Sequence, residues 1–414
     1  MTRLPARRPM PARSPREWAV RGGLAAAALA LGYVSTAQTL AYALVRTDPE
    51  RAFTLSPNDG RAAGALAQQI AGSEGADRPR ADRLARRALA AEPLAVKALT
   101  ALAIDTQIAG NTPAARRLFV HSDALSRREL GTRLWLIEDA VSRGDVPGAL
   151  RHYDIALRTE KSAPELLFPV LSSAISDPAI AAALLDTLKR KPNWADAFVF
   201  QLGFTDTDPR VRAAFMESLG RSGLKVPPAA QVSVINALIA AGQIDAAWRL
   251  HVGTRRDTPR DRSRDPRFSA AIDTPSPFDW NPVTDDSGIS ASIQSAPGGG
   301  VFDFSVPVTV GGVMLQQAQA LPAGRYRLSG KSAEIAQDAN AAPYWTLVCG
   351  DGRELGRVTV PNSAQDAGRF AGEFTVSGNC PVQFLRFVAR PSSATGGLAG
   401  RIEQVTLVPV GGAG

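Results

Sequence analysis

The amino-acid texture changes once along the chain, near Phe278, and this change constrains the fold more than any other feature. From Pro49 to about Arg256, Ala, Leu and Arg dominate and apolar residues recur at spacings of three and four, with Gly or Pro breaks between runs. That periodicity indicates helices. After Phe278, Gly, Val, Thr and Phe occur in short runs, which is typical of strands. The 414 residues therefore predict a multidomain protein that is α first and β second.

An uncharged apolar run, residues 22–45, follows a basic tail. As a helix it would rise about 36 Å, enough to cross a hydrocarbon core of about 30 Å. Six arginines precede it, against the single acid Glu17: Arg3, Arg7, Arg8, Arg13, Arg16 and Arg21. Basic flanks stay in the cytoplasm. We therefore expect a cytoplasmic tail (1–21), a single-pass transmembrane helix (22–45) in the inner (cytoplasmic) membrane, and the bulk of the chain in the periplasm.

A cleaved signal peptide is the alternative interpretation of the same segment. Its apolar region would be Leu24–Val34, and Ser35-Thr36-Ala37 would supply small residues for cleavage, leaving Gln38 as the new terminus. The apolar run continues to Val45, beyond the point where such a region should stop, which favours the uncleaved anchor. Both interpretations export the rest of the chain.

The charge distribution argues against nucleic-acid binding. The chain carries a net +8, but residues 1–21 alone carry +5, so the remaining body is close to neutral. A nucleic-acid-binding domain needs a concentrated basic surface. We therefore expect no nucleic acid among the partners.

The helical region contains a repeated turn. Gly110-Asn111-Thr112-Pro113 recurs as Gly144-Asp145-Val146-Pro147. In each copy Gly can end one helix, Asn or Asp can cap the next, and Pro is tolerated in its first turn. A repeat at a fixed period of about 34 residues predicts a helical array rather than a single bundle.

On these residues the region resembles a tetratricopeptide repeat. The small, aromatic and terminal-proline positions of that family are matched by Ala149, Tyr153, Ala156, Ala81, Ala88 and Pro93. The resemblance implies a solenoid over 47–253 whose concave face binds a protein partner. It is degenerate: Gly242 does not fall on the same period as Gly110 and Gly144, and Asp206–Lys225 fits least. A generic α-helical bundle remains the alternative.

A linker is expected at 254–277, where Arg and Asp alternate and Pro interrupts, and a β-sandwich at 278–412. Nine short strands in this region predict a jelly-roll-like sandwich. They are Ile289–Ser295, Val301–Val306, Val313–Ala318, Arg325–Ser329, Tyr344–Cys349, Glu354–Val360, Phe370–Val376, Val382–Ala389 and Ile402–Pro409.

The run Leu321-Pro322-Ala323-Gly324-Arg325-Tyr326-Arg327-Leu328 resembles a segment common in carbohydrate-binding-module-like sandwiches. The whole arrangement of anchor, repeats and β-module is similar to that of membrane-anchored bacterial envelope and exopolysaccharide-associated proteins. The resemblance implies polysaccharide as a partner, with Trp280, Tyr344 and Trp345 as aromatic residues that could stack on a sugar. The alternative is that these rings are buried in the core.

Both cysteines, Cys349 and Cys380, fall in the β-module at strand ends. An exported chain meets an oxidising compartment, so we expect them to form a disulfide. Two separate buried thiols are the alternative.

No motif for catalysis, cofactor or metal binding is found. Gly330-Lys331-Ser332 lacks the first glycine of a phosphate-binding loop, because position 325 is Arg. Residues Asp285–Gly288 lack the alternating spacing of a calcium loop. His121, His152 and His251 match no metal or triad motif.

We therefore expect no cofactor and no enzyme, but a non-catalytic membrane-anchored scaffold or adaptor on the periplasmic side, for example in surface polysaccharide assembly or export. A glycan-binding protein acting through the sandwich is the alternative, and an enzyme acting on envelope polymers is a weaker one.

Overall fold

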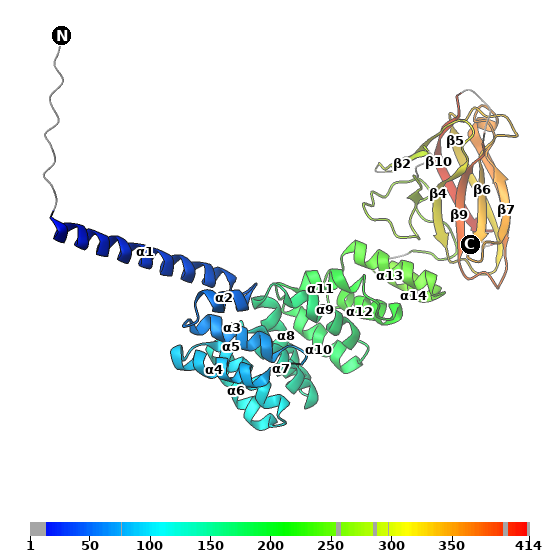
Figure 1. The fold of residues 1–414 in the computed structure, drawn as a ribbon. Helices are drawn as coiled ribbons and strands as arrows, with labels where there is room; N and C mark the ends of the chain where they lie inside the picture. The colour runs from blue at the N-terminus through cyan, green and yellow to red at the C-terminus, as the bar shows by residue number, and fades with distance from the viewer. Residues whose placement is uncertain are drawn as a thin grey trace, which may run out of the picture. The chain divides into compact units, whose positions relative to one another are not determined.

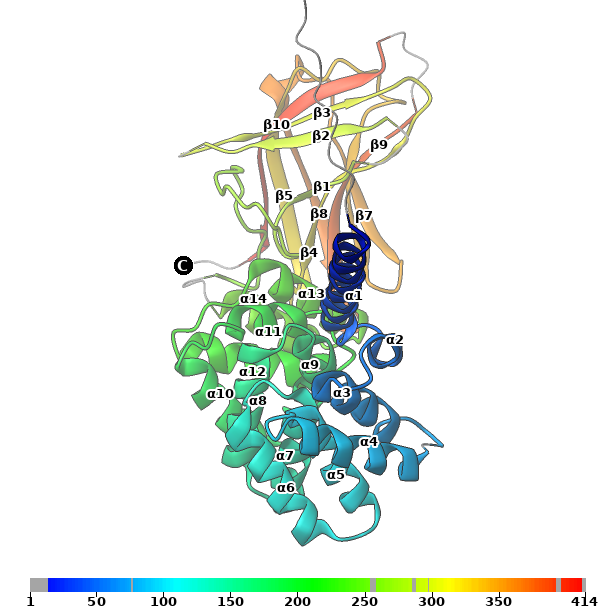
Figure 2. The same ribbon diagram turned by 60° about the vertical axis from the view of Figure 1, so that its left-hand side comes forward.

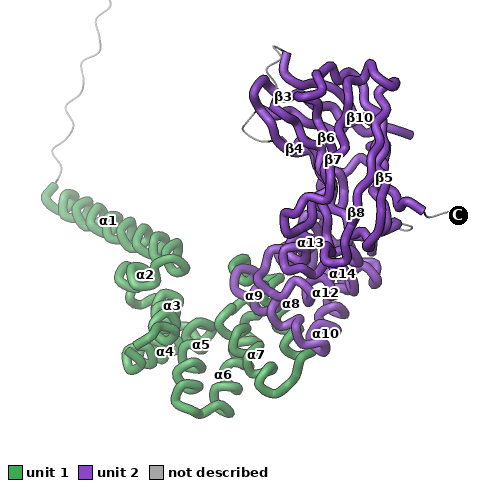
Figure 3. The backbone as a smooth tube through the Cα atoms, turned by 90° about the vertical axis from the view of Figure 1, so that its right-hand side faces the viewer, with its two compact units in different colours: residues 1–163 green, residues 164–414 purple. Residues whose placement is uncertain are grey.

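Helices form the first part of the chain and strands the second (Figure 1). The computed structural model describes residues 14–75, 77–253, 258–284, 288–296, 298–391 and 396–411. Arg3, Arg7, Arg8 and Arg13 of the expected cytoplasmic tail lie outside these ranges. By packing, the chain divides into two compact units, residues 1–163 and 164–414, which Figure 3 colours separately. The predicted order, helices followed by a two-sheet β domain, is confirmed.

Helix α1 (Pro15–Leu44) is 30 residues long and is the candidate membrane span. The side chain of Ser14 caps its first turn by accepting from the backbone N–H of Glu17. Its surface is almost entirely exposed, as expected of a helix whose partner is not protein. Near its end, however, Ala41 is fully buried in a small cluster with Ala52 and Ala62. The helix therefore runs directly onto the array without a separate linker.

The helices that follow are short and regular. In the first unit they are α2 (Pro49–Leu55), α3 (Gly60–Ala71), α4 (Arg78–Ala91), α5 (Val96–Ile108), α6 (Thr112–Leu125), α7 (Leu130–Ser142) and α8 (Val146–Thr159). In the second they are α9 (Ala163–Ala174), α10 (Pro178–Lys189), α11 (Ala195–Leu202), α12 (Pro209–Arg221), α13 (Pro228–Ala240) and α14 (Ile244–Val252). From α3 to α13, every second helix begins close to one repeat period after the one before, at positions 60, 96, 130, 163, 195 and 228. Helix α12 occupies the stretch Asp206–Lys225 that fits the repeat least.

The repeated turn has the conformation that its residues predict. Gly110 and Gly144 adopt positive φ angles of 85° and 70°, which a residue with a side chain rarely does. The side chains of Asn111 and Asp145 cap α6 and α8, and a proline lies in the first turn of each. The roles expected for this motif are confirmed.

Small residues allow the helices of the first unit to pack closely. One core cluster is built from alanines of α3, α4 and α5, including Ala67, Ala81 and Ala98. Gly64 on α3 lies so close to α5 that a Cβ there would be 3.1 Å from the backbone nitrogen of Ala98. The alanine-rich composition thus permits the short separation of the helices.

The C-terminal domain is a sandwich of two antiparallel five-stranded sheets (Figure 1, Figure 2). One has the order β1-β4-β9-β6-β7 and the other β2-β3-β10-β5-β8. The strands are β1 (Asn281–Pro282), β2 (Ser290–Gln294), β3 (Val301–Val306), β4 (Gly312–Gln319), β5 (Gly324–Ala333), β6 (Tyr344–Cys349), β7 (Glu354–Thr359), β8 (Arg369–Val376), β9 (Gln383–Ala389) and β10 (Leu398–Pro409). All nine predicted strands are present, and two of them, β3 and β6, begin and end at the predicted residues. The short strand β1 was not predicted.

The core lies between the two sheets. Alternate residues of β9 point inward, so that Leu385, Phe387 and Ala389 are buried while Phe384, Arg386 and Val388 lie on the outer face. From the opposite sheet, Phe302 and Phe304 meet Phe387 edge to face, with ring centroids 6.4 and 5.3 Å apart. Aromatic packing of this kind fixes the two sheets against each other.

The described part of the expected linker, residues 258–277, packs on the sandwich. The backbone N–H of Ser263 donates to the carbonyl of Leu407 on β10, at 2.9 Å. Phe268 is fully buried in the sandwich core. Packing places the division of the chain between Ala163 and Pro164, and not within this segment.

Candidate functional sites

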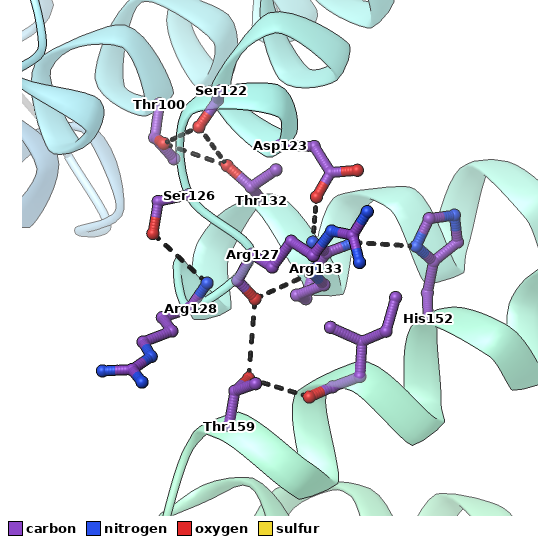
Figure 4. Close-up of polar contacts among 11 residues, drawn as sticks. Thr100, Ser122, Asp123, Ser126, Arg127, Arg128, Thr132, Arg133, His152 and Thr159 are labelled. Atoms are coloured by element: carbon purple, nitrogen blue, oxygen red, sulfur yellow. Dashed lines mark hydrogen bonds and ion pairs between the residues drawn. The ribbon is translucent and has the colours of Figure 1, made fainter.

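A buried polar cluster joins the helices of the first unit (Figure 4). The hydroxyls of Thr100 on α5, Ser122 on α6 and Thr132 on α7 form a triangle with sides of 2.8 to 3.0 Å. All three residues are fully buried. Each hydroxyl can donate one bond and accept others, so the three satisfy one another away from water. They fix the relative positions of three successive helices.

Arg133 on α7 is the centre of a second part of this cluster (Figure 4). Its side chain is 1% exposed. The guanidinium donates to Nδ1 of His152 on α8 at 3.1 Å, to the carbonyl of Arg127 at 3.2 Å, and to the carboxylate of Asp123 on α6. Burial lowers the pKa of Arg133, and the nearby Arg151 lowers it further. Every nitrogen of this guanidinium has a partner within the chain, which assigns it a structural role.

His152 is neutral in this environment. Burial lowers its pKa to about 4, and the positive charges of Arg133 and Arg151 act in the same direction. A neutral ring can present Nδ1 as an acceptor to Arg133. His152 therefore ties α8 to α7 and is not available to transfer protons near neutral pH.

A serine, a histidine and an aspartate meet where α14 contacts the sandwich. Ser276 Oγ lies 2.9 Å from His251 Nδ1 and 2.9 Å from Asp279 Oδ2. In a hydrolytic triad the histidine lies between the other two and takes the proton from the serine while the carboxylate orients it. Here the serine occupies the middle position, and it also forms a turn with Asp279 through the backbone. This arrangement anchors residues 276–279 to α14.

A cavity of about 400 Å³ lies beside this cluster, lined by Gln231, Ile235 and Asp273 among others. Next to it, Trp248 of α14 packs edge-on against Phe278, with centroids 5.2 Å apart. The guanidinium of Arg264 covers both rings, at 5.3 and 5.8 Å. Helix α14 and the sandwich segment thus share an aromatic core.

Two of the three predicted sugar-stacking residues are buried. Trp345 is fully buried and stacks on Phe387, and Trp280 is 5% exposed with its indole N–H donating to the carbonyl of Asp265. Neither indole can offer a face to a sugar, so the expectation is corrected for both. The alternation of β6 points Trp345 inward and Tyr344 outward. Of the three predicted residues, Tyr344 is the one on the outer face, where its side chain is half-buried.

Cys349 and Cys380 form the predicted disulfide, with Cα atoms 5.6 Å apart. Both residues are 2% exposed. The bond joins the end of β6 to the segment before β9.

The described residues contain no group of three or more His, Cys, Asp or Glu side chains that could hold a metal ion. Residues 285–287 of the Asp285–Gly288 turn lie outside the described ranges.

Exposed apolar pairs on α9 and α11 are a surface that the sequence analysis missed. Leu166 and Val170 on α9 are each 52% exposed. Phe200 on α11 is 46% exposed, and Phe204, just beyond its end, is 52% exposed. The two pairs are separated by the same interval as the repeated turns, and each has the i, i+4 spacing of one helix face. On the opposite faces, Phe168 and Phe198 hold the two helices together, with centroids 5.4 Å apart.

Comparison with known proteins places the chain in no family. No family model matches it, and no curated protein matches its sequence. Among solved structures, the enzymatically active domain of tailspike protein 4 from bacteriophage CBA120 is 12% identical, over 32% of this chain and 19% of that one, with a TM-score of 0.22. A glycosylation-associated protein (Gap123) complex from Streptococcus agalactiae is 10% identical, over 29% of this chain and 39% of that one, with a TM-score of 0.20. Similarity at this level establishes neither a shared fold nor a shared function.

Proposed function

We propose that this protein is a non-catalytic, membrane-anchored scaffold whose helical array binds a partner protein. The single observation that carries the proposal is the repeated exposure of Leu166 and Val170 on α9 and of Phe200 and Phe204 at α11. Large apolar side chains that gather on neighbouring helices are typical of protein interaction surfaces. In a tetratricopeptide-like array, as the sequence resemblance implies, such residues recur once per repeat and together form an extended binding surface.

The anchor is the second element of the proposal. Helix α1 is long and apolar enough to span a membrane, and its end packs on α2 and α3 through Ala41. The array would then be held at the periplasmic surface of the inner membrane. The envelope system that the sequence resemblance implies is surface polysaccharide assembly or export.

Site-specific photo-crosslinking in intact cells tests the partner. A photoreactive residue at Phe200 or Val170 should crosslink the full-length protein to one discrete partner. The matched control positions are Ala182 and Lys189, exposed on α10. Crosslinks of equal yield and pattern at all four positions would contradict a dedicated surface.

A topology reporter tests the anchor. A reporter fused after Leu250 should be active only in the periplasm, because the basic tail should remain in the cytoplasm. Amino-terminal sequencing of the mature protein then separates the two sequence interpretations. A terminus at Gln38 would show that the segment is a cleaved signal peptide.

A further inference from the structure

The outer face of the sheet β1-β4-β9-β6-β7 differs in charge pairing from the outer face of the other sheet. On the second sheet, most cations are paired with acids across strands. These pairs are Arg325 with Glu373, Lys331 with Glu403, and Arg401 with Glu334. On the first sheet, Arg386 and Arg390 form no ion pair with any described residue, and only Arg357 is paired, with Glu354. Counted over the residues that the structure describes, the first face therefore keeps an excess of positive charge.

These arginines lie together with aromatic rings. The guanidinium of Arg386 covers Phe384 at 5.2 Å, and those of Arg357 and Arg390 lie 4.7 and 4.9 Å from the ring centroid of Tyr344. In the strand register, Thr346 is opposite both Arg386 and Arg357, so the two arginines belong to one row across three strands. Adjacent strands are about 4.8 Å apart, which puts the two Cα atoms roughly 10 Å apart.

One donor on this face lacks an acceptor. The Nε of Arg386 is buried and has no hydrogen-bond partner among the described residues. Leaving a buried donor unpaired is unfavourable by about 1–3 kcal/mol, and more for a charged group. Because this Nε is inaccessible to solvent, an anion on the face would have to pair with the terminal nitrogens of the guanidinium.

From this geometry we propose that the face binds an acidic polysaccharide whose carboxylates pair with Arg386 and Arg390. A guanidinium fork matches a carboxylate in a bidentate geometry. Gln316, opposite Arg386, and Thr359, opposite Tyr344, lie on the same face and supply polar groups for hydroxyls. Two guanidinium groups lie close to the ring of Tyr344, at 4.7 and 4.9 Å from its centroid.

The surroundings of the face favour a polysaccharide over a protein. Helix α13 borders the Phe384 end, where a cleft of about 250 Å³ is lined by Val232, Asn236 and Ile239 of the helix and by Gln316 of the sheet. The valines of this face are half-buried and provide no deep apolar anchor of the kind that protein interfaces use. The proposal concerns a different surface from that of α9 and α11 and does not depend on it.

Binding of defined polymers to the full-length protein in detergent tests this inference. Alginate, a polyuronate, should bind, and the neutral glucan dextran should not. Arg386→Gln and Arg390→Gln should each raise the dissociation constant about tenfold, the loss expected for one charge-assisted pair. The control Arg327→Gln removes the same charge from the outer face of the other sheet. It should change the dissociation constant less than about twofold.

Several outcomes would overturn the proposal. If alginate does not bind, or if the Arg327 variant loses as much affinity as the Arg386 and Arg390 variants, this face is not a specific polysaccharide site. Tighter binding of poly-glutamate than of alginate would assign the face to an acidic protein instead. Arg386→Lys keeps the charge without the fork and should recover only part of the affinity. All variants should melt within a few degrees of the parent protein, so that a loss of binding is not a loss of fold.

Discussion

The guanidinium of Arg133 donates a hydrogen bond of 3.1 Å to Nδ1 of His152, and so joins two consecutive helices of the array. The arginine is almost fully buried, and burial of the neighbouring imidazole, reinforced by the charge of Arg133, lowers the pKa of His152 to about 4 and keeps the ring neutral. The pair therefore requires an uncharged His152 in the folded protein. This requirement gives the stability of the first unit a specific dependence on pH.

Stability should fall as the pH is lowered from about 6.5 to about 4. The pKa of His152 is near 6.5 in an unfolded chain and about 4 in the fold, so in this window the unfolded chain binds the extra proton. Above about pH 6.5 His152 is neutral in both states and the full unfolding free energy is retained; below about pH 4 the loss is complete. Because the ring is partly solvated, we expect the unfolding free energy to fall by about 1–2 kcal/mol across this window. Chemical denaturation from pH 4 to 8 measures it.

Replacing His152 by Gln should flatten that dependence. The amide oxygen can still accept from Arg133, but it does not titrate. The wild-type minus variant difference in unfolding free energy isolates this group from the other carboxylates. The same replacement at His121, exposed on α6, is the control. If both variants retain the wild-type pH profile, His152 is not the titrating group.

Thr132→Val should destabilise the first unit by about 1–2 kcal/mol. The variant loses the buried hydrogen bonds of the Thr132 hydroxyl, and the two remaining hydroxyls replace them only in part. The substitution keeps the shape of the side chain but removes one corner of the hydroxyl triangle, leaving Thr100 and Ser122 to bond each other. Val at Thr106, whose hydroxyl donates to the carbonyl of Leu102 in its own helix and bonds no other described residue, should have a smaller effect. Thermal unfolding compares the two variants, and an equal or larger loss at Thr106 would contradict a cooperative triangle.

Much of the fold follows from the sequence because its signals are local. In Val301–Val306, Phe302, Phe304 and Val306 alternate with more polar residues, and the same three are buried in the structure. The turn at Gly144 and Asp145 needs only its own residues to end one helix and cap the next. Such patterns require no knowledge of distant partners.

The sites are less predictable because their partners are remote in sequence. Alternating charges around Arg264 indicate a linker, yet its guanidinium donates to the carbonyls of Phe278 and Ala318 and is buried. Neither carbonyl can be recognised as an acceptor from the charge pattern. Trp280 and Trp345 are equally ambiguous, because a single indole has the same sequence signature in a core and at a sugar site. The recurrence of Leu166 as Phe200, one repeat period later, was available as a signal for the exposed surface.

Limited trypsin digestion should leave the peptide bond after Arg264 intact. The backbone N–H of Arg264 donates to the side chain of Gln317, and its carbonyl accepts from the same amide, at 3.1 and 3.2 Å. A protease must pull an extended segment into its active site, which would break both bonds. The stable C-terminal fragment should therefore begin before Arg264, as mass spectrometry can show. Gln317→Ala should speed cleavage there, and a parent fragment that begins at Asp265 would be inconsistent with this packing.

Reduction of the Cys349–Cys380 bond should destabilise the sandwich. The bond closes a loop with a sequence separation of 31 residues. On the chain-entropy model such a loop is worth about 3–4 kcal/mol, because the cross-link restricts the unfolded chain. The double variant Cys349→Ala, Cys380→Ala should show a matching loss in unfolding free energy and no further loss on adding reductant. In the non-reduced protein isolated from cells, mass spectrometry should find the two peptides linked. Quantitative alkylation of both thiols without reductant would contradict the bond in vivo, and with it the expected export to an oxidising compartment.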